Sequence, residues 1–98
     1  IMAIISKNET YGYEISRQLE EYGFGIIAEG TIYPLLLRLE KNNMVSAVYR
    51  QSELGPKRKY YSLTDKGKTE LEQFAKNYRE LSAAVERLFY DVEDGRNE

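Results

Sequence analysis

The strongest concentration of positive charge in the sequence is Lys57-Arg58-Lys59, directly after the turn-forming residues 52–56. Cations beside a tight turn can bind phosphate groups, which gives affinity for a nucleic acid of any sequence. Because side chains alternate along a strand, Lys57 and Lys59 should point one way and Arg58 the other. We therefore do not expect all three to contact DNA at once. The alternative is that these charges only protect an exposed strand edge from pairing with another chain.

A second group of polar residues lies in the segment before this run. Arg38 and Lys41 are about one helical turn apart and could reach bases or phosphates. Tyr11 and Tyr33 could donate hydroxyl hydrogen bonds to phosphate oxygens. The competing interpretations are a solvated helix face for the charged pair and packing for most of the nine tyrosines.

The distribution of charge along the chain also favours binding to a nucleic acid. The 98-residue chain has a net charge of −2, but residues 29–68 carry eight basic and four acidic residues, a net +4. Residues 1–28 and 69–98 have net charges of −2 and −4. A basic middle between acidic ends favours one face for a polyanion, although surface charge also varies without function.

Several classes of protein are excluded by composition. The chain contains neither cysteine nor histidine, which removes disulfides, Cys/His zinc sites and catalytic triads or dyads that use these residues. No acidic cluster has the spacing of a metal site. We therefore expect no metal, no cofactor and no enzymatic activity.

No apolar run approaches the roughly 18 residues of a membrane helix, and no secretory leader is evident. We expect a cytoplasmic protein without a membrane partner. The sequence begins inside an apolar stretch, Ile1-Met2-Ala3-Ile4-Ile5, so we expect the N-terminal helix to be truncated.

Residues 1–6 are typical of the end of a buried helix. Thr10 is expected to cap a second helix through its hydroxyl, and Gly23-Phe24-Gly25 to end that helix. The apolar stripe of this second helix is Tyr11, Ile15, Leu19 and Tyr22.

A third helix is expected to begin near residues 29–31, because Pro34 must lie close to a helix start. Asn42-Asn43 should end it. Its buried stripe is predicted to be Ile32, Leu35, Leu36 and Leu39, with Thr31, Tyr33, Arg38 and Lys41 facing outward.

Residues 44–51 and 57–63 favour two strands joined by a turn, and Thr64 is placed to cap a long final helix. Apolar residues of that helix alternate steps of three and four, as in a coiled-coil seam. Such a seam is too long for a body of about 60 residues to cover, which predicts a partner helix or second subunit. Packing on its own domain is the alternative. The seam is Leu71, Phe74, Tyr78, Leu81, Val85, Leu88 and Val92, and the expected dimer interface also includes Phe89.

This order of elements is that of a winged helix-turn-helix, in which the later helix enters the major groove and the hairpin lies along the backbone. The predicted fold class is α+β, mostly α. We divide the chain into a DNA-binding domain (1–63), a dimerisation helix (64–92) and an acidic tail (93–98) that we expect to be frayed.

Four segments resemble motifs of the PadR family of transcriptional regulators. Thr10-Tyr11-Gly12-Tyr13-Glu14-Ile15 is similar to the opening of its helix-turn-helix. The segment from Glu29 to Lys41 resembles its recognition helix, Gly55 to Tyr61 its wing, and Leu63-Thr64-Asp65-Lys66-Gly67 its strand-to-helix junction.

The resemblance implies a dimeric repressor whose C-terminal helix packs against the partner's N-terminal helix, with release from the operator by a small molecule. It implies that Thr31, Tyr33 and Arg38 are recognition-helix contacts and that Tyr11 and Lys57–Lys59 contact the DNA backbone. The single C-terminal helix is similar to the smaller-sized branch of the family. Two departures concern the site. Leu37 stands where the family usually has a polar or basic residue, and we expect it to pack, with contact to a thymine methyl as the alternative. No tryptophan is present to stack a ligand at the dimer centre.

The sequence therefore predicts a homodimeric repressor that binds a palindromic operator in double-stranded DNA, with a small aromatic molecule as effector. A winged-helix module that binds another protein through its final helix is the alternative. A monomer without affinity for DNA would favour that alternative.

Overall fold

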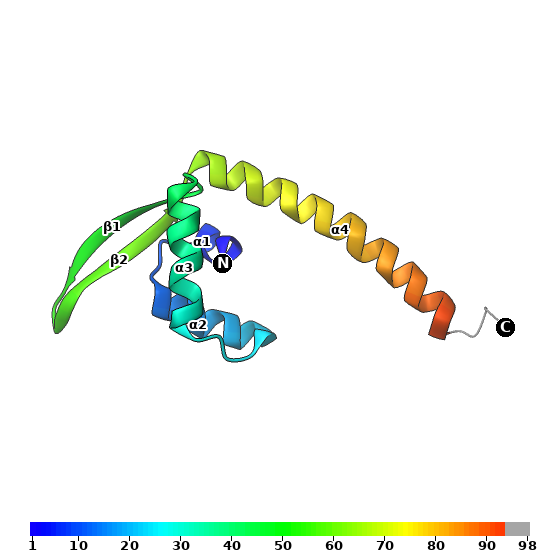
Figure 1. Ribbon diagram of the computed structural model, residues 1–98, viewed down its shortest axis with the longest axis horizontal. Coiled ribbons are helices and arrows are strands. Elements are labelled where there is room, and N and C mark those ends of the chain that lie inside the picture. The colour runs from blue at the N-terminus through cyan, green and yellow to red at the C-terminus, as the bar shows by residue number, and fades with distance from the viewer. Residues whose placement is uncertain (94–98) are drawn as a thin grey trace.

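A computed structural model of the chain describes residues 1–93; residues 94–98, which hold most of the expected acidic tail, lie outside the described residues. The predicted fold class is confirmed: helices precede a two-stranded hairpin, which a long helix follows (Figure 1). The elements are α1 (Met2–Lys7), α2 (Gly12–Leu19), a π-helical turn (Glu20–Phe24), α3 (Glu29–Lys41), β1 (Val45–Ser52), β2 (Gly55–Leu63) and α4 (Asp65–Glu93).

The core lies where α1, α2 and α3 meet the base of the hairpin. Each of these elements contributes an apolar side chain that is less than a tenth exposed, and β2 contributes Tyr61. The apolar core residues are Ile4, Ile5, Ile15, Leu19, Ile32, Leu36, Val45 and Tyr61. This core holds the two helices of the helix-turn-helix and the wing in one body.

Thr10 does not cap α2, contrary to the prediction. Tyr11 occupies the capping position, and its side chain makes no capping bond. Thr10 instead pairs with Tyr61 through two backbone hydrogen bonds of 2.7 and 3.1 Å. This pairing buries Thr10, whose hydroxyl has no hydrogen-bond partner among the described residues.

The predicted glycines do end this helical segment, but the last residue of its predicted apolar stripe is not buried. Gly23 and Gly25 have φ angles of 102° and 81°, a region that residues with a Cβ rarely adopt. Tyr22, expected on the buried stripe, is 57% exposed, because the π-helical turn changes the helical phase after Leu19.

Helix α3 begins at Glu29 and ends at Lys41, as expected. Pro34 is nevertheless the sixth helical residue, in the second turn, where it cannot donate the usual hydrogen bond to the Gly30 carbonyl. Leu35 was expected to be buried but is 39% exposed, because it faces a groove towards α4 instead of the core.

The hairpin is antiparallel, with Val45 paired to Leu63 and Arg50 to Arg58. The register becomes irregular between Arg50 and Ser52, near the tip. The strand β2 begins at Gly55, two residues before the predicted start, because the pairing continues into the turn.

Thr64 caps α4 as predicted. Its hydroxyl oxygen accepts a hydrogen bond from the Gly67 amide at 3.0 Å and donates one to the Asn43 carbonyl at 2.6 Å. A Cβ on Gly67 would lie 2.0 Å from the Met44 carbonyl oxygen, so the first turn of α4 touches the chain entering β1. The direction in which α4 leaves the domain depends on this close approach.

Helix α4 extends away from the rest of the chain (Figure 1). The described chain measures 64 × 28 × 20 Å, and its radius of gyration is 17.7 Å. A compact chain of this length would have a radius of about 13 Å. Beyond the half-buried Leu71, the seam predicted on α4 is not covered by its own domain, so the alternative of a helix packed on that domain is wrong. None of the helices in the described part of the chain is long and apolar enough to cross a membrane.

Replacing Gly67 with alanine should destabilise the protein by about 1–3 kcal/mol, because backbone atoms must move to admit the methyl group. Gly30→Ala is the matched control, since a Cβ there meets nothing within 4 Å. Urea unfolding measures both variants. Equal stability of the two variants would contradict the close crossing at Gly67.

Candidate nucleic-acid interface

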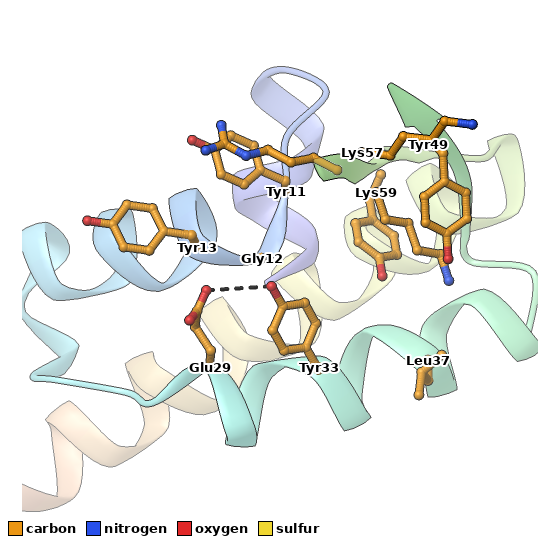
Figure 2. Close-up of a pocket in the computed structure, with 11 residues that line it drawn as sticks. Tyr11, Gly12, Tyr13, Glu29, Tyr33, Leu37, Tyr49, Lys57 and Lys59 are labelled. Carbon is orange, nitrogen blue, oxygen red and sulfur yellow. Dashed lines mark hydrogen bonds between the residues drawn. The ribbon is translucent and has the colours of Figure 1, made fainter. Parts of the chain in front are cut away.

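A concave surface of about 540 Å³ lies between α3 and the wing, next to the first residues of α2 (Figure 2). The start of α2, helix α3 and both strands of the wing contribute residues to it. Its lining residues are Tyr11, Gly12, Tyr13, Glu29, Tyr33, Leu37, Tyr49, Lys57, Arg58, Lys59 and Tyr61. We refer to these eleven residues as the cleft.

Helix α3 presents Tyr33 and Leu37 to the cleft. Tyr33 is 44% exposed, as predicted for an outward-facing residue, whereas Leu37 is 58% exposed and does not pack as expected. Leu37 follows Tyr33 by one helical turn, so both lie on the face directed at the wing instead of the core.

The remaining α3 residues with a predicted role are exposed but lie outside the cleft. Thr31 and Lys41 are at the surface. Arg38 lies about 140° around the helix from Tyr33 and borders an apolar groove between α1, α3 and α4. The cleft therefore brings together Tyr11, Tyr33 and the wing cations, but not Thr31, Arg38 or Lys41.

Tyr33 is placed by Gly12, a residue to which the sequence pattern assigned no role. A Cβ on Gly12 would lie 2.7 Å from Cε1 of the Tyr33 ring, so only glycine lets the ring rest against α2. The Tyr33 hydroxyl donates a hydrogen bond to Glu29 at 3.5 Å (Figure 2). Burial, together with the negative charge of Glu29, raises the pKa of Tyr33 above its ordinary value.

Arg58 lies on the face of the wing that meets the start of α2. Its guanidinium carbon is 4.6 Å from the centre of the Tyr11 ring. The Tyr11 ring meets the Tyr60 ring edge to face at 5.3 Å. This stacking orders the Arg58 side chain while its nitrogen atoms keep their capacity to donate.

Lys59 lies on the opposite face, in register with Tyr49. Its ammonium nitrogen is 2.7 Å from a Glu40 carboxylate oxygen, a contact between the wing and α3. The hydrogen bond to Glu40 raises the pKa of Lys59. Lys57 lies beside Lys59 and Tyr49 in Figure 2, so the wing follows the predicted alternation of faces.

Residues 1–73 match the family described as the transcriptional regulator PadR-like family. The chain belongs to this family. The resemblance based on four sequence motifs is thereby confirmed, and the family consists of transcriptional regulators, which are not in general enzymes.

Similar PadR-like structures come from several bacteria. A PadR-like transcriptional regulator from Bacillus cereus is 46% identical with a TM-score of 0.81, and the match covers 90% of this chain and 85% of that one. A PadR family regulator from Clostridium difficile is 34% identical with a TM-score of 0.81, covering 90% and 92%. An uncharacterized protein from Lysinibacillus sphaericus is 33% identical over 95% of this chain and 87% of its own length.

One solved relative contains nucleic acid. The structure of Bacillus subtilis PadR in complex with operator DNA is 28% identical with a TM-score of 0.69, and the match covers 76% of this chain and 42% of that one. Both helices of the helix-turn-helix and the wing of this PadR-like chain lie within the family match.

Replacing Gly12 with alanine should displace the Tyr33 ring while leaving the fold intact, because the methyl group meets a side chain and not the backbone. The displaced ring is more hydrated, so the pKa of Tyr33 should fall towards its ordinary value of 10.0. NMR titration of tyrosine labelled at Cζ measures the shift. Gly30→Ala should leave the Tyr33 titration unchanged, and an unchanged titration in Gly12→Ala would contradict the contact.

Proposed function

We propose that this protein is a homodimeric, sequence-specific DNA-binding repressor acting in the cytoplasm, and that a small aromatic molecule releases it from its operator. One observation carries the proposal. Tyr33 and Leu37 of α3 and the three wing cations border one cleft, in a fold shared with a PadR protein solved on operator DNA.

In this proposal α3 enters the major groove and the wing follows the backbone. Thr31, Arg38 and Lys41 are exposed on α3 outside the cleft, and in this proposal they contact base edges or phosphates beside it. Tyr33 contributes a hydroxyl at the rim of the cleft.

Phosphate binding falls to the wing and the start of α2. Arg58 is held in place by Tyr11, which reduces the conformational entropy lost when its guanidinium binds a phosphate. Lys57 is exposed and belongs to the same strand. Tyr11 can donate its hydroxyl to the same stretch of backbone.

The exposed stripe of α4 supports a dimer. Phe74, Leu81 and Leu88 are each more than 60% exposed, and they share one side of the helix. Monomeric proteins rarely leave a contiguous apolar surface of this length in water. A second copy would bury the stripe through a heptad interface made by Leu71, Phe74, Tyr78, Leu81, Val85, Leu88, Phe89 and Val92.

A dimer presents two α3 helices at a separation that depends on how the α4 helices pack. Palindromic DNA with half-sites one helical turn or a multiple apart fits such a pair. An aromatic effector bound beside α4 would change that separation and weaken the complex.

A protein-interaction module is the second candidate, since the same stripe would bury equally well against the helix of another protein. Fluorescence anisotropy with DNA from the upstream region of its own gene separates the two functions. Tight binding with a steep dependence on salt supports the regulator. Weak binding that is equal for all sequences, by a monomer, favours the interaction module.

Replacing Arg38 with alanine should weaken operator binding by about 1–3 kcal/mol at fixed salt, the cost of losing one base contact. Arg79→Ala on α4 removes the same charge from a residue away from the wing and is the control. Equal affinity losses in the two variants would show a general charge effect and remove Arg38 from the site.

Replacing Leu81 with aspartate should convert the dimer to a monomer, because a charge would be buried in the seam without a partner. Light scattering measures the mass. Thr69→Asp adds the same charge to α4 outside the stripe and should stay dimeric. A dimeric Leu81→Asp protein would show that α4 is not the interface.

A further inference from the structure

The wing is attached to the helix-turn-helix by two ion pairs, one on each face. Arg50 of β1 lies 2.7 Å from a Glu9 oxygen, and Lys59 of β2 lies 2.7 Å from a Glu40 oxygen. The other ion pairs of the described residues are local, since both join Arg17 to glutamates within four residues. Of the two long-range pairs, only the one at Lys59 reaches the recognition helix.

The surroundings of Lys59 restrict what its ammonium group can do. It lies 5.8 Å from the centre of the Tyr49 ring and 5.6 Å from that of Tyr61. Its side chain is 23% exposed, and Glu40 occupies one of its three donor positions. The adjacent Glu40 carboxylate offsets the positive charge of the ammonium group, which weakens its attraction for a phosphate oxygen.

The ion pair between Lys59 and Glu40 lies between the base and the tip of the hairpin. Tyr61 anchors the base of the wing in the core, and the strand continues past Lys59 to the turn at Gly55. The segment from Lys59 to Gly55 spans roughly 13 Å at the rise of an extended strand. Lys59 thus pairs with α3 between the buried base of the wing and its exposed tip.

We propose that Glu40 and Lys59 are positioning residues whose ion pair sets the separation between the wing and the recognition helix, and that Lys59 is not itself a phosphate contact. The DNA-binding part of this inference rests on the proposed function. The pair acts through Lys57 and Arg58, which precede Lys59 on β2. These two cations are directed at the DNA backbone only while the wing keeps its position relative to α3.

Replacing Glu40 gives the clearest test, because the two explanations predict opposite changes in affinity for DNA. A carboxylate near DNA repels phosphates, so Glu40→Gln should tighten binding if Glu40 contributes only its charge. If Glu40 positions the wing, the same change should weaken binding about threefold to fivefold, the range expected for loss of a partly exposed ion pair.

The binding experiment compares Glu40→Gln, Lys59→Met, the exchanged pair Glu40→Lys/Lys59→Glu, and the control Glu53→Gln at the wing tip. Operator affinity is measured by anisotropy over a range of salt. We expect both single variants to weaken binding with an unchanged salt slope, the exchanged pair to recover affinity, and Glu53→Gln not to weaken it. Tighter or unchanged binding by Glu40→Gln, or a salt slope lowered by about 0.9 in Lys59→Met, would overturn the proposal.

A measurement without DNA separates this inference from the proposed function. Backbone ¹⁵N relaxation reports the order of residues 52–58 relative to α3. The order of residues 52–58 should fall in Glu40→Gln and Lys59→Met. It should be restored in the exchanged pair, whether or not the protein binds DNA. Unchanged order of residues 52–58 in both single variants would overturn the inference that the ion pair positions the wing. If the unmodified protein does not bind the operator but this order still depends on the ion pair, the proposed function is overturned and the positioning role is not.

Discussion

The pairing of Tyr61 with Thr10 is the interaction on which the rest of the structure depends. Tyr61 is 2% exposed, and its backbone exchanges two hydrogen bonds with Thr10 just before α2. A hairpin of two strands is only marginally stable alone. This isolated bridge pairs the chain before α2 with the base of the hairpin, and it places the aromatic ring of Tyr61 in the helical core. The base of the wing and the helix-turn-helix therefore share one core.

The faces of the wing follow from that anchor. With Tyr61 turned into the core, Lys59 must point towards α3, while Tyr60 and Arg58 must point towards the start of α2. Each direction meets a suitable partner, Glu40 on one side and the Tyr11 ring on the other. The wing is thus oriented by side chains that also border the cleft, and the stability of the fold and the shape of the site are coupled.

The second constraint is the junction at Thr64 and Gly67. The hydroxyl of Thr64 bridges the start of α4 to the end of α3, and the absent side chain of Gly67 permits the crossing over Met44. Helix α4 consequently leaves the domain instead of folding back on it. The small core cannot cover its apolar stripe, and the same geometry that creates this exposed surface makes it available to a second chain.

The local chemistry of the sequence determined the elements and much of the site. Pro34, the glycines after α2, Asn42-Asn43 and Thr64 each act on neighbouring backbone, so helix ends could be predicted from them. Heptad spacing revealed the stripe on α4 for the same reason. The tertiary structure alone decided the rest. Thr10 entered a β-bridge instead of a cap, and Leu37 was left exposed at the cleft. Tyr33 came to rest on Gly12, and Lys59 was paired with Glu40, which lies 19 residues away. Sequence periodicity cannot specify such contacts, because they depend on where separate elements meet once the core has formed.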